Sequence, residues 1–158
     1  MSVTVVKEYL RQFRKSDRIQ KVNVPITSIE EASDALGIMP SKLVTCAVFM
    51  NKTNDGCIMI ITSGDAIVDK SRYKAKFRYI PEELDESQTV EYTGYNFDDL
   101  CPFAVKEETT KIYLDKTLKR YDYIYPSGGD LYSVVKLSPD ELFRCSKAVD
   151  WVEMAKAW

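Results

Sequence analysis

Two apolar segments constrain the fold of this 158-residue chain more than any other feature. Residues 44–50 (VTCAVFM) and 57–62 (CIMIIT) are nearly continuous apolar runs of strand length. Between them, residues 54–56 (NDG) are a hairpin turn signal, because Asn and Gly tolerate positive φ. Strands that are apolar throughout are buried on both faces. The pair therefore predicts a central hairpin that needs helices or further sheet on each side.

Several segments outside this hairpin have the periodicity or the capping residues of helices. Residues 6–13 place apolar side chains three and four positions apart, which predicts an amphipathic opening helix. Ser28 and Glu31 form a capping box, and Gly37 suits the C-terminal cap of the same helix. The same signals predict helices in residues 69–79, in residues 80–86 with Pro81 near the first turn, from Ser138 onward, and in residues 147–158.

The remaining strand patterns lie mostly in the C-terminal half. Alternating or apolar runs predict short strands at residues 21–25, 111–115, 122–126 and 131–136. The aromatic residues 92–97 also resemble a strand that leads into a turn. We find no internal repeat, low-complexity tract or linker. The sequence predicts a single domain over residues 1–158, of the α/β (mixed α+β) class.

Composition excludes several classes of function. The net charge of −2 provides no broad cationic face for long nucleic acid, although a few lysines suffice to contact one end of an RNA. The chain has no histidine, which removes the commonest general base and the usual zinc ligand sets. Its four cysteines have no C-x-x-C spacing and suit reduced thiols. We expect a cytoplasmic protein with no cofactor, no bound metal and no membrane segment.

The stretch TGYNFDDLCP, residues 93–102, is the first candidate for chemistry. Asp98 and Asp99 could hold a metal, act as a general base or position a water molecule, whereas the alternative is that they only cap a turn. Cys101 beside them has only acids nearby, so a buried structural cysteine is favoured over a nucleophile.

Two other motifs have a functional and a structural interpretation. The cations of residues 70–78 alternate with aromatic residues. In the functional interpretation the cations contact phosphate while the rings stack on a base. In the structural interpretation the cations form a solvated helix face and the rings pack inward. The SGGD motif, residues 127–130, could present N–H groups to an anion, or it is only a tight turn. The structural interpretation is favoured in both cases.

The order of these motifs resembles the YbaK family of aminoacyl-tRNA editing domains, which also occur as an insertion in bacterial prolyl-tRNA synthetases. The resemblance covers about residues 3 to 145, and no single motif in it is specific. It depends on a series of short motifs in matching order: Leu36-Gly37 with Pro40, Gly64-Asp65 with Val68-Asp69, Thr93-Gly94-Tyr95, Pro102, Asp115 with Leu118, Gly128-Gly129, and Leu137 to Leu142.

The resemblance implies a mixed, partly barrel-like sheet flanked by helices. It also implies a deacylase that hydrolyses the ester of a mischarged amino acid at the tRNA 3′ end. In such a mechanism a small pocket admits the wrong side chain, backbone N–H groups of a glycine-containing loop approach the carbonyl, and a lysine grips the terminal phosphate. The ribose hydroxyl and a water supply the proton transfers, which suits a chain without histidine.

This chain departs from the family pattern at two places. Thr45 occupies the position of the family lysine, and Asp98 and Asp99 replace the paired glycines of the loop. Losing glycine limits close approach of the backbone to a ligand. Losing one electrostatic contact to a transition state costs about 3–4 kcal/mol. Weak activity or a changed substrate is therefore expected, unless Lys42 substitutes for the missing cation.

The first hypothesis is a free-standing editing deacylase with a divergent pocket. Its partners would be the acceptor end of an aminoacyl-tRNA and an aminoacyl-tRNA synthetase, and the oligomeric state stays open. The predicted catalytic residues are Lys42, Thr45, Asp98 and Asp99. The predicted substrate-binding residues are Gly64, Asp65, Thr93, Gly94, Tyr95, Leu100, Cys101, Pro102, Gly128 and Gly129. The alternative is a binding or regulatory module that keeps the fold and has lost deacylation.

Overall fold

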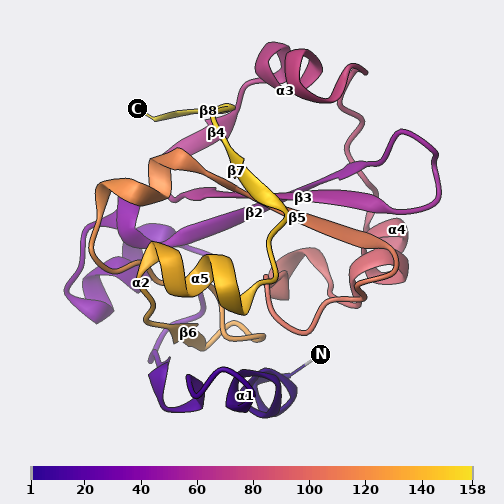
Figure 1. Cartoon of the computed structure of the whole chain (residues 1–158). Coiled ribbons are helices and arrows are strands. Elements are labelled where there is room, and N and C mark those ends of the chain that lie inside the picture. Colours follow the sequence, from indigo (N-terminus) through magenta and orange to yellow (C-terminus); the bar gives the residue numbers. More distant parts are fainter. Residues whose placement is uncertain (1, 158) are drawn as a thin grey trace.

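The computed structural model describes residues 2–157 and combines short helices with short strands (Figure 1). Its α-helices are α1 (Val3–Arg11), α2 (Ile29–Leu36), α3 (Lys70–Phe77), α4 (Glu86–Thr93) and α5 (Pro139–Cys145). Its strands are β1 (Ile19–Lys21), β2 (Val44–Met50), β3 (Cys57–Ser63), β4 (Ala66–Val68), β5 (Thr110–Asp115), β6 (Ser133–Val135), β7 (Asp150–Val152) and β8 (Ala155–Ala157).

A mixed four-stranded sheet forms the centre of the fold. Its strand order is β2-β3-β5-β7, in which β2 and β3 are antiparallel while β5 is parallel to both β3 and β7. A bridge between Leu43 and Tyr125 leads from the start of β2 toward the small sheet of β1 and β6. The predicted hairpin and the mixed, partly barrel-like sheet flanked by helices are confirmed.

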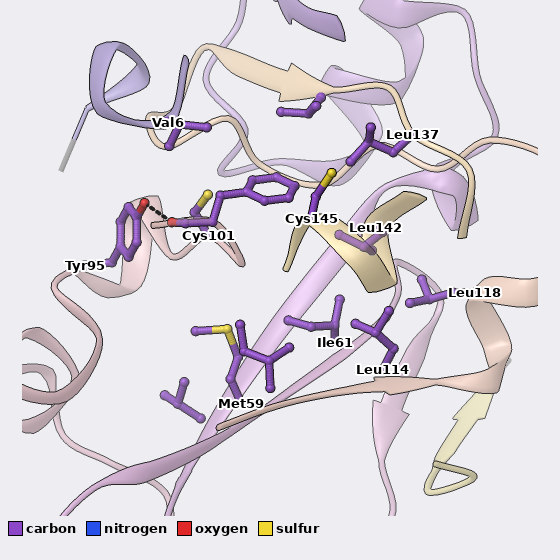
Figure 2. Packing of buried hydrophobic residues seen from close by; sticks show 14 of the residues in the cluster. Val6, Met59, Ile61, Tyr95, Cys101, Leu114, Leu118, Leu137, Leu142 and Cys145 are labelled. Atoms are coloured by element: carbon purple, nitrogen blue, oxygen red, sulfur yellow. Dashed lines mark hydrogen bonds between the residues drawn. The ribbon is translucent and has the colours of Figure 1, made fainter. Parts of the chain in front are cut away.

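The helices cover the two faces of the central sheet. In Figure 1, α3 lies on one side of the sheet, whereas α1, α2 and α5 lie on the other. On the α3 side, Tyr73 packs with Phe49, Ile58 and Ile60. The larger cluster on the opposite side joins Val6 of α1 and Leu142 of α5 to β3 and β5 (Figure 2). Burial on both faces explains why every residue of β3 is buried.

The predicted helix caps are present where the sequence signals were strongest. Ser138 caps α5, and the reciprocal bond from its backbone N–H to Glu141 completes a capping box. The Ser28 side chain accepts a hydrogen bond from the backbone N–H of Glu31 at the start of α2. Gly37 ends α2 in the left-handed region with φ 68°. These helix ends depend on local hydrogen bonds, which the sequence specifies directly.

Two predicted elements are displaced along the chain, and two predicted strands do not form. The strand expected at residues 21–25 is β1, which ends at Lys21. The helix expected from Pro81 begins only at Glu86, because Asp85 and Gln88 form the capping box. As a consequence, α4 extends through Thr93, and the strand-like interpretation of residues 92–97 is wrong. Of the strand expected at residues 122–126, only isolated bridges form.

The closing helix predicted for residues 147–158 is also wrong, because the described part of that segment forms β7 and β8. β7 pairs in parallel with β5. The buried carboxylate of Asp115 accepts hydrogen bonds from the backbone N–H groups of Met154 (2.8 Å) and Ala155 (3.0 Å). The ring of Trp151 stacks on Phe143 of α5. These contacts with distant residues outweigh the local helical pattern.

Candidate functional site

The outer edge of β2 presents backbone hydrogen-bonding groups that no strand covers. Hydrogen bonds from the N–H of Val44 to Tyr125 (3.3 Å) and from the N–H of Met50 to Glu82 (2.8 Å) fix the two ends of this edge. In an antiparallel strand, alternate residues direct their N–H and C=O to the same side. Cys46 and Val48 therefore direct their backbone groups outward, and no described residue bonds their N–H groups.

Two adjacent hollows follow this edge, and we call them together the edge groove. The first is about 210 Å³ and is lined by Ile26, Val44, Thr45, Cys46, Phe97, Asp98, Leu100, Ser127 and Asp130. The second is about 310 Å³ and is lined by Cys46, Ala47, Val48, Phe49, Glu83, Leu84, Phe97 and Leu100. Cys46, Phe97 and Leu100 line both, so the two hollows adjoin beside the uncovered backbone of β2.

Local structure brings residues 98–102, which we call the DDLCP loop, against β2. Gly94 ends α4 with φ 89°, and Phe97–Asp99 then form a single 3-10 turn. Tyr95 is fully buried, and its hydroxyl donates a hydrogen bond to the carbonyl of Phe103 (Figure 2). The thiol of Cys101 donates to the carbonyl of Ser127 at 3.2 Å. This last bond joins the loop to the SGGD turn, so both walls of the first hollow are held together.

The first hollow is acidic. Asp98 and Asp130 line it, and its lining contains neither Lys nor Arg. In the neighbouring Asp99, the Oδ1 atom is buried without a hydrogen-bond partner among the described residues. Carboxylates without cationic partners favour a positively charged group and disfavour a phosphate. The hollow therefore suits an ammonium group better than an anion.

The two cysteines beside the groove are poor nucleophiles. Burial raises the pKa of Cys101 to about 12. Burial also raises the pKa of Cys46, and the nearby Cys101 adds to that shift. Only a thiolate attacks a carbonyl carbon effectively, and a thiol with so high a pKa stays protonated near neutral pH. The groove therefore offers backbone groups and carboxylates, and no activated thiol.

Thr45 and Lys42 both direct their side chains to partners other than the loop. The Thr45 hydroxyl lies 2.8 Å from the hydroxyl of Thr62. Strand alternation puts the Thr45 side chain on the α3 face, so Cys46 is the β2 residue whose side chain faces the loop. The ammonium of Lys42 lies 5.7 Å from the ring centre of Tyr121, and Lys42 is absent from the lining of the groove.

Gly64 and Asp65 form a separate turn after β3. Asp65 accepts hydrogen bonds from Arg120 (2.7 Å) and from the hydroxyl of Ser63 (2.6 Å). The hydrogen bond from Arg120 is the main reason that the pKa of Asp65 is lowered. A Cβ atom at Gly64 would lie only 2.5 Å from the carbonyl oxygen of Pro40. Both residues thus hold a turn that does not line the edge groove.

The other predicted binding residues shape the groove from behind. Thr93, Tyr95, Cys101, Pro102, Gly128 and Gly129 are all buried, and Gly94 is the C-cap of α4. The N–H of Gly128 bonds the carbonyl of Ser133, and Gly129 lies against Val6 of α1. Of the predicted residues, only Thr45, Asp98 and Leu100 line the groove itself. Their roles in binding or catalysis stay predictions.

Several groove residues were not selected from the sequence. Ile26, Val44, Cys46, Phe97, Ser127 and Asp130 line the first hollow. Ser127 and Asp130 belong to the SGGD motif, which was considered for its backbone N–H groups and not for these two side chains. Cys46 follows Thr45 on a predicted strand, so strand alternation would have put it on the opposite face. Nothing in the sequence indicated which face the loop covers.

Two further properties concern residues 2–157. Within them, no three Cys, Asp or Glu side chains gather as a metal site requires. None of the helices in this range has the length and apolar character needed to span a bilayer.

The chain is similar to known proteins in both sequence and fold. Residues 23–145 match the sequence model of the aminoacyl-tRNA editing domain. Because the match covers well over half of the chain, the protein belongs to that family. The family was predicted from the ordered short motifs, and this prediction is confirmed.

Individual relatives agree with this assignment. The uncharacterized protein YwhH of Bacillus subtilis is 26% identical over 158 residues, which is 100% of this chain and 99% of YwhH. The proline–tRNA ligase of Thermotoga maritima is 31% identical over 72 residues, or 45% of this chain, and the matched part is 12% of the ligase. A solved structure of a candidate trans-editing enzyme for prolyl tRNA synthetase has a TM-score of 0.87 at 18% identity, with 99% of each chain covered. That similarity shows a shared fold.

Proposed function

We propose that the protein hydrolyses the ester of a mischarged aminoacyl-tRNA, with the aminoacyl group bound in the edge groove. The observation that carries this proposal is the meeting of three segments at one hollow. These are the uncovered edge of β2, the turn at Phe97–Asp99 and the SGGD turn. The family membership supports an editing role for the groove.

The groove offers a complementary group for each end of the aminoacyl moiety. Its α-ammonium would lie between the carboxylates of Asp98 and Asp130. The ester carbonyl oxygen would accept hydrogen bonds from the outward N–H groups of Cys46 and Val48, as in other sites that stabilise an oxyanion through backbone N–H groups. The attacking water and the ribose hydroxyl would supply the proton transfers, since the side chains of the groove include no activated thiol.

The lining of the first hollow indicates which amino acid it prefers. The hollow is about 210 Å³ and adjoins the second hollow of the edge groove. Ile26, Val44 and Leu100 give the hollow apolar walls. We expect an apolar side chain to be preferred over a charged one.

One observation favours a second candidate function. Thr45, which the resemblance assigns to the position of the family lysine, has its hydroxyl hydrogen-bonded to Thr62. The lining of the groove contains neither Lys nor Arg, so it offers no cation for the terminal phosphate. A binding module would keep the ammonium site at Asp98 and Asp130 and hydrolyse nothing.

A panel of mischarged tRNAs tests the first function. The purified protein is expected to release at least one amino acid faster than the uncatalysed rate. A variant that restores the glycine pair of the family loop (Asp98→Gly and Asp99→Gly) distinguishes the two candidates. If the natural chain hydrolyses no ester while this variant does, the natural protein is a binding module derived from an editing enzyme.

A further inference from the structure

α3 presents a row of cations that the edge groove does not use. Lys70, Arg72, Lys74, Lys76 and Arg78 are all exposed on α3 and its C-cap, whereas Tyr73 is buried. The ring of Phe77 packs against Tyr73 and Tyr113. The rings therefore face inward, as the structural interpretation predicts. No described carboxylate pairs with any of the five cations.

A shallow groove continues this row toward the edge of the sheet at β7. It is about 280 Å³ and is lined by Lys76, Lys116, Trp151, Val152, Glu153 and Met154. The ammonium of Lys119 lies 4.3 Å from the ring centre of Trp151. Lys116 and Lys119 belong to the 3-10 helix η4 (Lys116–Arg120), which directly follows β5. Cations of α3 and η4 thus meet across one groove.

The row ends close to the edge groove. Arg120, the last residue of η4, lies 5.1 Å from the ring centre of Tyr121. Lys42 lies 5.7 Å from the same ring. Lys42 is only two residues before Val44, which lines the first hollow of the edge groove. We call this continuous set of cations, from α3 through η4 to Lys42, the cationic band.

The band concentrates positive charge in one region of a chain whose net charge is −2. The band contains Lys42, Lys70, Arg72, Lys74, Lys76, Arg78, Lys116, Lys119 and Arg120. Only Lys116 and Arg120 form ion pairs, with Glu153 and Asp65. Asp69, at the N-terminus of α3, is already paired with Lys156. Seven of the nine cations are therefore available to an anionic partner within the described residues.

We propose that the cationic band binds the sugar-phosphate backbone of the tRNA acceptor arm while the 3′ end occupies the edge groove. This inference rests on the proposed function, because it assigns the RNA-binding surface of the same substrate. Lysines that are spread over a surface contact phosphates and do not read bases, so the contact is independent of sequence. The helix α3 has 8 residues, and at 1.5 Å per residue it spans about 12 Å, the distance of a few successive phosphates.

The salt dependence of tRNA binding tests the band. Unfractionated tRNA serves as the probe, because the proposed contact is independent of sequence. The band variant carries Lys74→Gln, Lys76→Gln and Lys119→Gln, and the control variant carries Lys7→Gln, Lys21→Gln and Lys52→Gln at exposed sites outside the band. Removing three phosphate contacts should lower the slope of log K against log salt by about 2 to 3 and weaken binding about tenfold. The control should change the slope by less than about 1. Equal slopes for the two variants would overturn the proposal.

A second measurement separates this proposal from the proposed function. Aminoacyl esters of a CCA trinucleotide carry the scissile ester but lack the acceptor stem that the band is proposed to bind. The band variant should hydrolyse them at the wild-type rate and lose activity only on full-length tRNA. If the wild-type protein hydrolyses no ester but the band variant still loses the salt slope, the band stands and the hydrolase function fails. If the trinucleotide esters are hydrolysed and the band variant binds tRNA normally, the band fails alone.

Discussion

Two acidic turns of the molecule, Gly64–Asp65 and Asp98–Asp99, resemble each other in sequence and differ in what surrounds them. Asp65 is held by Arg120 and by Ser63, and its turn packs tightly against Pro40. Asp98 is exposed at the rim of the edge groove, and Asp99 has a buried oxygen with no described partner. A carboxylate whose hydrogen bonds are satisfied stabilises a fold. A carboxylate that lines the groove and is exposed, such as Asp98, is available to a ligand.

The largest expected effect is the loss of deacylation activity when the carboxylates of the edge groove, and not Asp65, are replaced. The double change Asp98→Asn and Asp130→Asn removes both charges that would hold the α-ammonium group. A hydrogen bond to a charged group contributes about 1.5–3 kcal/mol, so kcat/KM for mischarged tRNA should fall by about a hundredfold. Asp65→Asn is the matched control and should leave kcat/KM unchanged. An equal loss in both variants would show that the groove carboxylates only support the fold.

The next effect concerns stability at the Gly64 turn. Gly64→Ala places a Cβ atom 2.5 Å from the Pro40 carbonyl oxygen. Such overpacking against backbone should cost about 1–3 kcal/mol in the free energy of unfolding, measured by urea denaturation. At Gly37, the space around a new Cβ is open and only the positive φ opposes alanine. Gly37→Ala should therefore cost about 1 kcal/mol, and a larger loss there would contradict the packing argument.

The hydrogen bonds of the Glu141 carboxylate are satisfied, as those of Asp65 are. Its contribution to stability can be tested from the pH dependence of the free energy of unfolding. Burial opposes its ionisation, but hydrogen bonds from Lys15 and from the backbone of Ser138 outweigh that effect and lower its pKa to about 2. A carboxyl group with a lowered folded-state pKa stabilises the fold above its unfolded value of 4.5 and loses that contribution as pH falls toward 2. Glu141→Gln should cost of order 2 kcal/mol at pH 7 and little near pH 2, in denaturation at a series of pH values. A cost that stays constant with pH would contradict this origin.

The smallest expected effect is at the unsatisfied carboxylate. Asp99→Asn removes a charge whose Oδ1 atom is buried without a partner. The variant should be up to about 1 kcal/mol more stable than the natural protein, as measured by urea denaturation. Asp98→Asn, at an exposed side chain, should stay within about 0.5 kcal/mol. A loss of stability in Asp99→Asn would show that the carboxylate has a structural partner.

The sequence predicted the hairpin of β2 and β3, the caps of α2 and α5 and the inward rings of α3. These features depend on neighbouring residues and on alternation, which short stretches of sequence specify. The prediction of a closing helix was wrong because its strands depend on Asp115, about 40 residues earlier in the chain. The prediction of a strand-like lead-in to the DDLCP loop was wrong for a different reason, because a local capping box at Asp85 and Gln88 starts α4 at Glu86 and the helix then extends through Thr93.

The candidate site could be predicted only in part. Asp98 and Leu100 line the edge groove, and their roles stay predictions, whereas Gly64 and Asp65 belong to a turn that Arg120 closes from a distant segment. The sequence by itself determined the family, the central hairpin and the two acidic turns. The tertiary structure decided that one edge of β2 is uncovered, that Cys46 faces the loop, and that the cations of α3 and η4 form one band. These features require contacts between segments far apart in the chain, and local propensity and periodicity do not encode such contacts.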